Sequence, residues 1–440
     1  MRKVNTISLS LCAIFLFYVP GVLWGQLSPK PAGLQSEPIL LSGGTIHTGT
    51  GEVITKGLLG FKEGRITYLG NMEAKGSDFD EYRIIDITGQ HIYPGLILPN
   101  SLIGIEEISA VPHSNDKLEQ GDINPSIKTV FAFDTGSSHI PTLRFNGILM
   151  VESIRSGGTI SGTSTVMELD GWNWMEAVHK NEAAIHLRWP SAFSSSYDTA
   201  TKTSRIKKST SYDSKTRELE DLFVAARTYN IGYKQPTNLK LASLQGLFDG
   251  SKTLVVHASE PKEIIESILF AQTHKVDRIA LVTSYSAFMV RDFIRENNIP
   301  VILPPTYAYP RRADMAYDAH YKLPFLLTKE GITVALSHTG MLSTSRNLPF
   351  YAGMAAAFGL EKEEALKLVT LNPAKILGID ARVGSLMVGK DATLFVSRGD
   401  ALDVQTNSLS LAFIRGKNII LDGPHQENFK RYSEKFGHGE

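Results

Sequence analysis

Histidine, arginine and carboxylate side chains are the groups through which this sequence could do chemistry. Its only cysteine, Cys12, lies in an apolar run near the amino terminus. If that run is removed, thiol nucleophiles, disulfides and cysteine-bound zinc are excluded. His257 ends the run TLVVH, which predicts a buried strand. Arg311 and Arg312 follow the turn PPTYAYP, and they could hold a substrate carboxylate bidentately.

The composition indicates a globular protein with small-molecule partners. Of 440 residues, 42% are hydrophobic and 20% are charged, so the chain is long enough for a large core and a second small one. Lys plus Arg and Asp plus Glu both number 45. No net field therefore favours nucleic acid or an anionic membrane surface.

The amino terminus predicts an export signal over residues 1–25. A basic start, MRK, precedes an apolar run from Leu9 to Trp24 and a small residue, Gly25. A membrane anchor is the alternative, but the run is shorter than the ~20 residues that span a bilayer, and Pro20 interrupts it. We expect a periplasmic or secreted chain that begins near Gln26 and has no stable membrane anchor.

Both ends of the remaining chain predict one small sheet domain. Residues 38–93 contain short β-rich runs divided by glycine pairs, and residues 383–425 repeat that style. Each set of strands alone buries too little apolar surface. We expect the two segments to fold together.

Residues 94–380 alternate apolar strands with helices, which predicts a parallel α/β architecture of the (β/α)8 type. An open doubly wound sheet is the alternative, although no G-x-G-x-x-G motif sits at a strand-to-helix turn. A Ser-, Thr- and Lys-rich stretch over residues 190–214 predicts a mobile surface loop within this domain. The predicted strands are Gly95–Leu98, Gly147–Val151, Ile185–Trp189, Thr253–His257, Arg278–Thr283, Pro300–Leu303 and Thr333–Ser337.

Four stretches in order resemble the amidohydrolase superfamily, and its imidazolonepropionase-like branch in particular. They are GGTIHTGTGEVI, YPGLILPN, KLVTLNPAKILGI and VGSLMVGKDATLFV. The resemblance runs from about Ile39 to Leu421. It implies a (β/α)8 TIM-type barrel beside a small β-sandwich domain formed by the two terminal segments.

The resemblance also implies metal chemistry at the carboxyl ends of the barrel strands. There one or two divalent ions lower the pKa of a bound water to ~7, and a strand-end Asp moves the proton. The usual ligands are a His-x-His pair after strand one, a carboxylated Lys or Glu in mid-barrel, two later His, and that Asp. The pair falls here on Asn100 and Leu102, and the second later His falls near Thr283.

The remaining family positions keep part of this chemistry. Glu168 at mid-barrel and His257 are the predicted metal ligands. Thr339 falls at the catalytic Asp position, with His338 beside it, and these two are the predicted catalytic residues. Asn100, Arg311 and Arg312 are the predicted substrate-binding residues. Each retained residue also has a structural alternative: His257 a hydrogen-bonded strand end, Glu168 a loop carboxylate, and His338 an alignment shifted by one residue.

An acidic loop follows the first barrel strand, in IEEISAVPHSNDKLEQGDINP. It is either a solvated surface loop or a source of carboxylates that replace the missing histidines and favour Mn or Mg over Zn.

These residues support two main functional hypotheses. The first is an exported metal-dependent hydrolase of carbon–nitrogen bonds other than peptide bonds, acting on a cyclic or linear amide with one divalent ion. The second is a non-catalytic member of the family, which serves as a binding module or partners an active homologue. The chain would bind a small molecule and no nucleic acid, and would assemble as a homo-oligomer or with a related amidohydrolase. A third functional hypothesis is a protein with an open doubly wound sheet that binds a sugar or a nucleotide.

Overall fold

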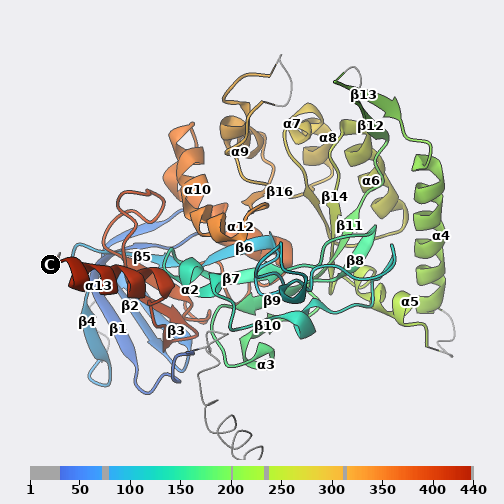
Figure 1. The fold of residues 1–440 in the computed structure, drawn as a ribbon. Helices are drawn as coiled ribbons and strands as arrows, with labels where there is room; N and C mark the ends of the chain where they lie inside the picture. Colours follow the sequence, from blue (N-terminus) through green and yellow to red (C-terminus); the bar gives the residue numbers. More distant parts are fainter. Residues whose placement is uncertain (1–29, 72–78, 200–201, 232–236, 311–314, 438–440) are drawn as a thin grey trace, which may run out of the picture.

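Segments from the two ends of the chain share one eight-stranded sheet, drawn at the left of Figure 1. In the computed structural model, residues 30–71, 79–199, 202–231, 237–310 and 315–437 are described, so the predicted signal at 1–25 lies outside the described residues. The sheet order is β20-β19-β18-β5-β1-β2-β3, with β4 also pairing β1. Its strands are β1 Ile39–His47, β2 Val53–Lys62, β3 Arg65–Asn71, β4 Arg83–Asp86, β5 His91–Pro94, β18 Leu394–Ser397, β19 Leu409–Ile414 and β20 Lys417–Asn418.

Antiparallel pairing between β5 and β18 joins the amino- and carboxyl-terminal halves of this sheet. Apolar residues from both halves fill one core, in which the rings of Phe61 and Phe413 meet edge to face at 4.9 Å between centroids. The structure thus places both terminal segments in one sheet, as predicted. This arrangement is a single sheet in the described residues, and the predicted sandwich stays a prediction.

The larger domain is mixed α/β, as predicted, with parallel strands and covering helices (Figure 1). Its parallel strands are β6 Leu96–Ser101, β7 Ile148–Ser153, β11 Ala184–Arg188, β14 Thr253–His257, β15 Ile279–Val282, β16 Val301–Leu303 and β17 Val334–Leu336. Its α-helices are α2 His139–Arg144, α3 Trp174–Ala177, α4 Tyr212–Ile231, α5 Leu239–Ser243, α6 Pro261–Thr273, α7 Ser286–Met289, α8 Arg291–Glu296, α9 Ala319–Lys329, α10 Leu348–Ala357, α11 Lys362–Lys367 and α12 Leu371–Leu377. No helix in the described ranges is long and apolar enough to cross a membrane.

Strand pairing in this domain runs in two sheets within the described residues, ordered β10-β9-β7-β6 and β17-β16-β15-β14-β11-β8. Three short strands, β8 Ile160–Thr163, β9 Thr165–Glu168 and β10 Val178–Lys180, stand between β7 and β11 and pair antiparallel. On the far side, Ile97 donates to the carbonyl of Val369, and Leu336 donates to that of Leu368, both at 2.9 Å. Closure into eight continuous parallel strands therefore stays a prediction.

Side-chain alternation along the parallel strands decides what reaches their carboxyl ends. Small and β-branched residues form one buried layer between the strands: Ala184, Val255, Ala280, Ile302 and Ala335. Their neighbours, such as Ile185 and Leu254, face the main core instead. Two residues beyond Ala184 and Val255 on the same side stand His186 and His257, so polar side chains occupy the next layer.

The stretch over residues 190–214, predicted as a mobile surface loop, contains a β-hairpin. Its strands are β12 Phe193–Asp198 and β13 Thr203–Lys208, paired antiparallel, and α4 then begins at Tyr212. The many polar residues hid the alternation that places Phe193, Tyr197 and Ile206 in these strands.

A truncation tests the shared sheet. Removing residues 383–440 deletes β18, β19 and β20, leaves β5 as an open edge and exposes its apolar partners, so we expect aggregation in size-exclusion chromatography. Removing only residues 423–440 deletes α13, Pro424–Phe436, which buries none of its residues, and this control should elute as the full chain does. A 383–440 deletion that unfolds cooperatively as a monomer would contradict the account.

Candidate ligand-binding site at the strand ends

Five polar residues gather where the parallel strands end, and we call them the strand-end site. They are Asn100 on β6, Glu152 on β7, His186 and Arg188 on β11, and His257 on β14. Glu152 and His186 are almost fully buried, while His257 and Arg188 are partly exposed. The site is therefore reached from the side of His257 and Arg188.

A chain of hydrogen bonds crosses three strands in this site. Glu152 Oε1 lies 2.9 Å from His186 Nε2, and His186 Nδ1 lies 2.9 Å from His257 Nε2. Ser164 donates its hydroxyl to Glu152 Oε1 at 2.6 Å, and the backbone amide of Asn100 donates to Oε2 at 3.0 Å. Both oxygens of the buried carboxylate are thus satisfied by protein groups.

The direction of these bonds follows from the ionised carboxylate, which can only accept. His186 must then donate through Nε2, and its Nδ1, when the ring is neutral, accepts from Nε2–H of His257. This assignment leaves Nδ1 of His257 with a free lone pair. His257 can accept a hydrogen bond or a proton there.

The charge states agree with this direction. Burial opposes ionisation of Glu152, but the interaction with His186 and the hydrogen bonds from His186, Ser164 and the Asn100 amide outweigh it and hold the Glu152 pKa below its ordinary value. Burial, with further contributions from His186 and Arg188, holds the pKa of His257 well below its ordinary value. At neutral pH His257 is therefore an uncharged imidazole, connected through His186 to the ionised carboxylate of Glu152.

Asn100 was predicted to bind substrate, and the structure places it in the strand-end site. Its φ of 54° is in the left-handed region, which is uncommon for a residue other than glycine. Its Oδ1 is buried without a hydrogen-bond partner in the described residues. An unsatisfied buried polar atom calls for a partner, so this oxygen is a candidate for a ligand contact.

His338 and Thr339, the predicted catalytic residues, follow the carboxyl end of β17. His338 is buried, with Nδ1 at 2.9 Å from the Tyr351 hydroxyl and Nε2 at 3.1 Å from the Met341 carbonyl. Both ring nitrogens are thus engaged by the protein, while Thr339 is exposed. Their catalytic role stays a prediction, as does the substrate-binding role of Arg311 and Arg312, which lie outside the described residues.

Glu168 and His257, the predicted metal ligands, lie at opposite ends of the strands. In the antiparallel pair of β7 and β9, Glu168 stands opposite Met150, near the start of β7, whereas His257 is the last residue of β14. The mid-barrel carboxylate that approaches the strand ends is Glu152 instead. The physical reason is the inserted antiparallel β9, which reverses the chain direction and carries Glu168 away.

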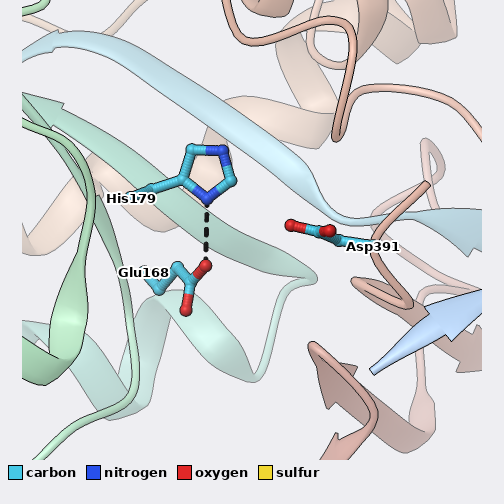
Figure 2. Close-up of side chains that lie close together, drawn as sticks. All are labelled: Glu168, His179 and Asp391. Atoms are coloured by element: carbon cyan, nitrogen blue, oxygen red, sulfur yellow. Dashed lines mark hydrogen bonds and ion pairs between the residues drawn. The ribbon is translucent and has the colours of Figure 1, made fainter. Parts of the chain in front are cut away.

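Glu168 belongs to a second cluster, between the two domains. Glu168 on β9, His179 on β10 and Asp391 before β18 face one another, with ligand atoms that all lie within 4.8 Å of one another (Figure 2). His179 Nδ1 is 3.0 Å from Glu168 Oε1. These donor types could hold a divalent ion.

Three arginines already compensate the carboxylates of Glu168 and Asp391. Arg415 Nε is 2.7 Å from Glu168, and Asp391 is 2.7 Å from both Arg65 and Arg382. They are ion pairs by distance, without hydrogen-bond alignment. A divalent ion would have to displace guanidinium groups from a cluster in which positive charge already exceeds negative charge, so the local electrostatics favour an interdomain salt bridge.

The strand-end site does not fit the metal centre that the sequence resemblance implies. Only His186 and His257 offer imidazole nitrogens there, and those nitrogens bond to each other. Asn100 and Thr283 replace expected histidines, and Arg188 places a positive charge beside His257. Catalytic zinc commonly takes three protein ligands, and the three possible donors here, Glu152, His186 and His257, are already bonded to one another in a chain beside a positive charge.

The acidic loop after β6 satisfies its carboxylates locally. Glu106 pairs with Lys117 at 2.6 Å, and Glu107 accepts from the hydroxyl of Ser137 at 2.7 Å. These contacts favour the structural alternative for the loop over substitute metal ligands.

Glu152, His186 and Arg188 are functional candidates that the motif comparison did not predict. Each interrupts an otherwise apolar strand, in ILMVES and in AIHLR. A polar residue near the last inward position of a buried strand is the signal that could have found them.

The pH dependence of stability tests the state of His257. The unfolded chain protonates His257 below its ordinary pKa of about 6.5, whereas the folded chain does not, so the free energy of unfolding should fall as pH drops from 7 to 5.5. One such proton contributes up to about 1.4 kcal/mol per pH unit. In denaturant titrations His257→Gln should flatten this slope, while the exposed control His425→Gln should not. Equal slopes for His257→Gln and wild type would contradict the account.

Comparison with known proteins places the fold. The model of the amidohydrolase family matches residues 133–420. An amidohydrolase from Thermotoga maritima MSB8 superposes with a TM-score of 0.74 at 20% identity, covering 87% of this chain and 99% of that chain. Molinate hydrolase gives 0.53 at 14% identity (88% and 96% covered), and a putative prolidase from Bifidobacterium longum gives 0.52 at 15% (91% and 100%).

Those structural likenesses concern the fold, and no curated protein matches the sequence. The imidazolonepropionase-like branch stays a prediction. Because the family match extends over well more than half of the sequence, the chain belongs to the amidohydrolase family.

Proposed function

We propose that this chain is an exported, ligand-binding member of the amidohydrolase family, which holds a small amide-type molecule at the strand-end site without metal-assisted hydrolysis. The observation that carries the proposal is the 2.9 Å contact between His186 Nδ1 and His257 Nε2. It commits one ring nitrogen of each histidine to a protein hydrogen bond, so the two rings point at each other and not at a shared ion. As a binding module, or as the partner subunit of an active homologue, the chain would use the site without turnover.

The geometry suits recognition of an amide. Nδ1 of His257 can accept the N–H of an amide, because Nε2 donates to His186 in the assigned hydrogen-bond chain. The side-chain oxygen of Asn100 has no protein partner in the described residues, so a ligand could satisfy it. Pairing this buried atom would recover part of the ~1–3 kcal/mol that an unsatisfied polar group costs.

Hydrolysis of a carbon–nitrogen bond other than a peptide bond is the second candidate, favoured by the relay of Glu152, His186 and His257. His257 would take a proton from water at Nδ1, and the water oxygen would bond to the amide carbon. The C–N bond would break as the leaving nitrogen receives that proton, and Glu152 would stabilise the charged imidazoles. The metal-dependent form of this hypothesis needs an ion at His257 or in the cluster of Glu168.

Metal content separates these possibilities. Protein purified without chelator and equilibrated with Zn, Mn or Mg should retain far less than one ion per chain by plasma mass spectrometry. As a positive control, Asn100→His with Leu102→His restores the family's first pair and should increase zinc retention.

Two variants locate any ion that wild type retains. If wild type holds stoichiometric metal and hydrolyses an amide, and His257→Ala loses both properties, the proposal is wrong and the chain is a metal-dependent enzyme. Loss in His179→Ala instead would assign the ion to the interdomain cluster. Hydrolysis that persists in EDTA and disappears in Glu152→Gln would favour the metal-free candidate.

Export is the other part of the proposal, supported by the basic start and apolar run over residues 1–25. N-terminal sequencing of protein from the periplasmic or extracellular fraction should give a start near Gln26. Protein that keeps Met1 and sediments with membranes would show an anchor instead.

A further inference from the structure

Arg188 is the one cation of the strand-end site, and its position follows from strand geometry. Alternate residues of a strand face the same side, so Arg188 shares the side of His186. It is the last residue of β11 and stands opposite His257 in the parallel pair with β14. Its Cα is therefore level with that of His257 and one layer beyond that of His186.

Arg188 has no side-chain ion pair or hydrogen bond among the residues that the structure describes. Other cations that are buried to a similar or greater extent do have partners: Arg144 reaches Asp170 at 3.5 Å, and Lys252 reaches Glu182 at 2.5 Å. Glu152 is the nearby carboxylate of the site, but His186, Ser164 and the Asn100 amide already use its oxygens.

Burial without an anion is costly for a guanidinium, which must give up part of its hydration. That cost lowers the pKa of Arg188, with burial as its cause and no opposing carboxylate. A neutral polar atom of the same site, Asn100 Oδ1, is also without a partner, and this residue is only 5% exposed. The site therefore holds a charge and a dipole that no described residue pairs.

We propose that the strand-end site binds an amide that also bears a carboxylate, with the carboxylate on Arg188. The guanidinium would take the carboxylate oxygens bidentately, and Nδ1 of His257 would accept the amide N–H. This inference rests on the proposed function, and it adds the chemical class of the ligand.

The test uses a matched pair of probes, N-acetylglycine and its neutral analogue N-acetylglycinamide, in calorimetric titrations of the full mature chain. Wild type should bind N-acetylglycine saturably and the neutral analogue far more weakly. Arg188→Met should weaken N-acetylglycine binding roughly 10- to 100-fold, Arg188→Lys should retain part of it, and the exposed control Arg398→Met should bind as wild type does.

Thermal unfolding of the unliganded variants gives a second readout. If Arg188 is held in place for a ligand, Arg188→Met removes an uncompensated charge and should unfold at a higher temperature than wild type. If it is a structural residue, the same variant should unfold at a lower temperature.

Three results would overturn the inference: no saturable binding of N-acetylglycine to wild type, equal affinity in Arg188→Met, or preference for the neutral probe. None of them bears on metal retention. The proposed binding role can therefore stand even if the ligand carries no carboxylate. A retained metal ion would contradict the binding role, but it would not decide whether the ligand is charged.

Discussion

The buried carboxylate of Glu152 is the group on which the strand-end site depends. It has no exposed surface, so its charge is tolerable only because His186, Ser164 and the Asn100 amide all donate to it. These donors come from β11, from the residue between β8 and β9, and from β6. Satisfying one carboxylate therefore fixes the rotamer of His186, and through His186 that of His257, in the layer directly above the apolar floor.

In the proposed binding role, hydrogen bonds stand at the place in the fold where the family's metal chemistry is expected. In a metal centre the imidazole nitrogens would converge on an ion, and a carboxylate behind them would orient the rings. In this chain the two imidazoles bond to each other. The consequence is a neutral His257 with an outward lone pair and a free guanidinium beside it, a surface suited to binding a polar molecule.

The fold was predictable from the sequence to a large extent. Alternating apolar strands and helices predicted the mixed α/β domain, and glycine-divided short strands at both ends predicted the shared sheet that β5 and β18 complete. The hairpin of β12 and β13 was missed because its serines and lysines mask a weak alternation. A two-stranded ribbon with exposed residues carries little hydrophobic signal for a pattern to detect.

The site was predictable only in part. Motif positions led to Asn100 and His257, which do lie at the strand ends, but they also led to Glu168. No pattern reveals that β9 runs antiparallel, so the direction of the Glu168 side chain was beyond sequence reasoning. Glu168 lies instead among arginines of distant segments, including Arg415 of the carboxyl-terminal sheet, where it helps to hold the two domains together.

Nitrogen-15 NMR of the histidine rings at neutral pH tests the central claim most directly. The account predicts that His257 carries its proton on Nε2 and His186 on its Nε2, with Nδ1 unprotonated in both rings, and that adding zinc leaves these signals unchanged. Loss of the Nε2 proton of His257, or a large shift of both rings when zinc is added, would contradict the hydrogen-bonded relay and show that the two imidazoles bind a metal.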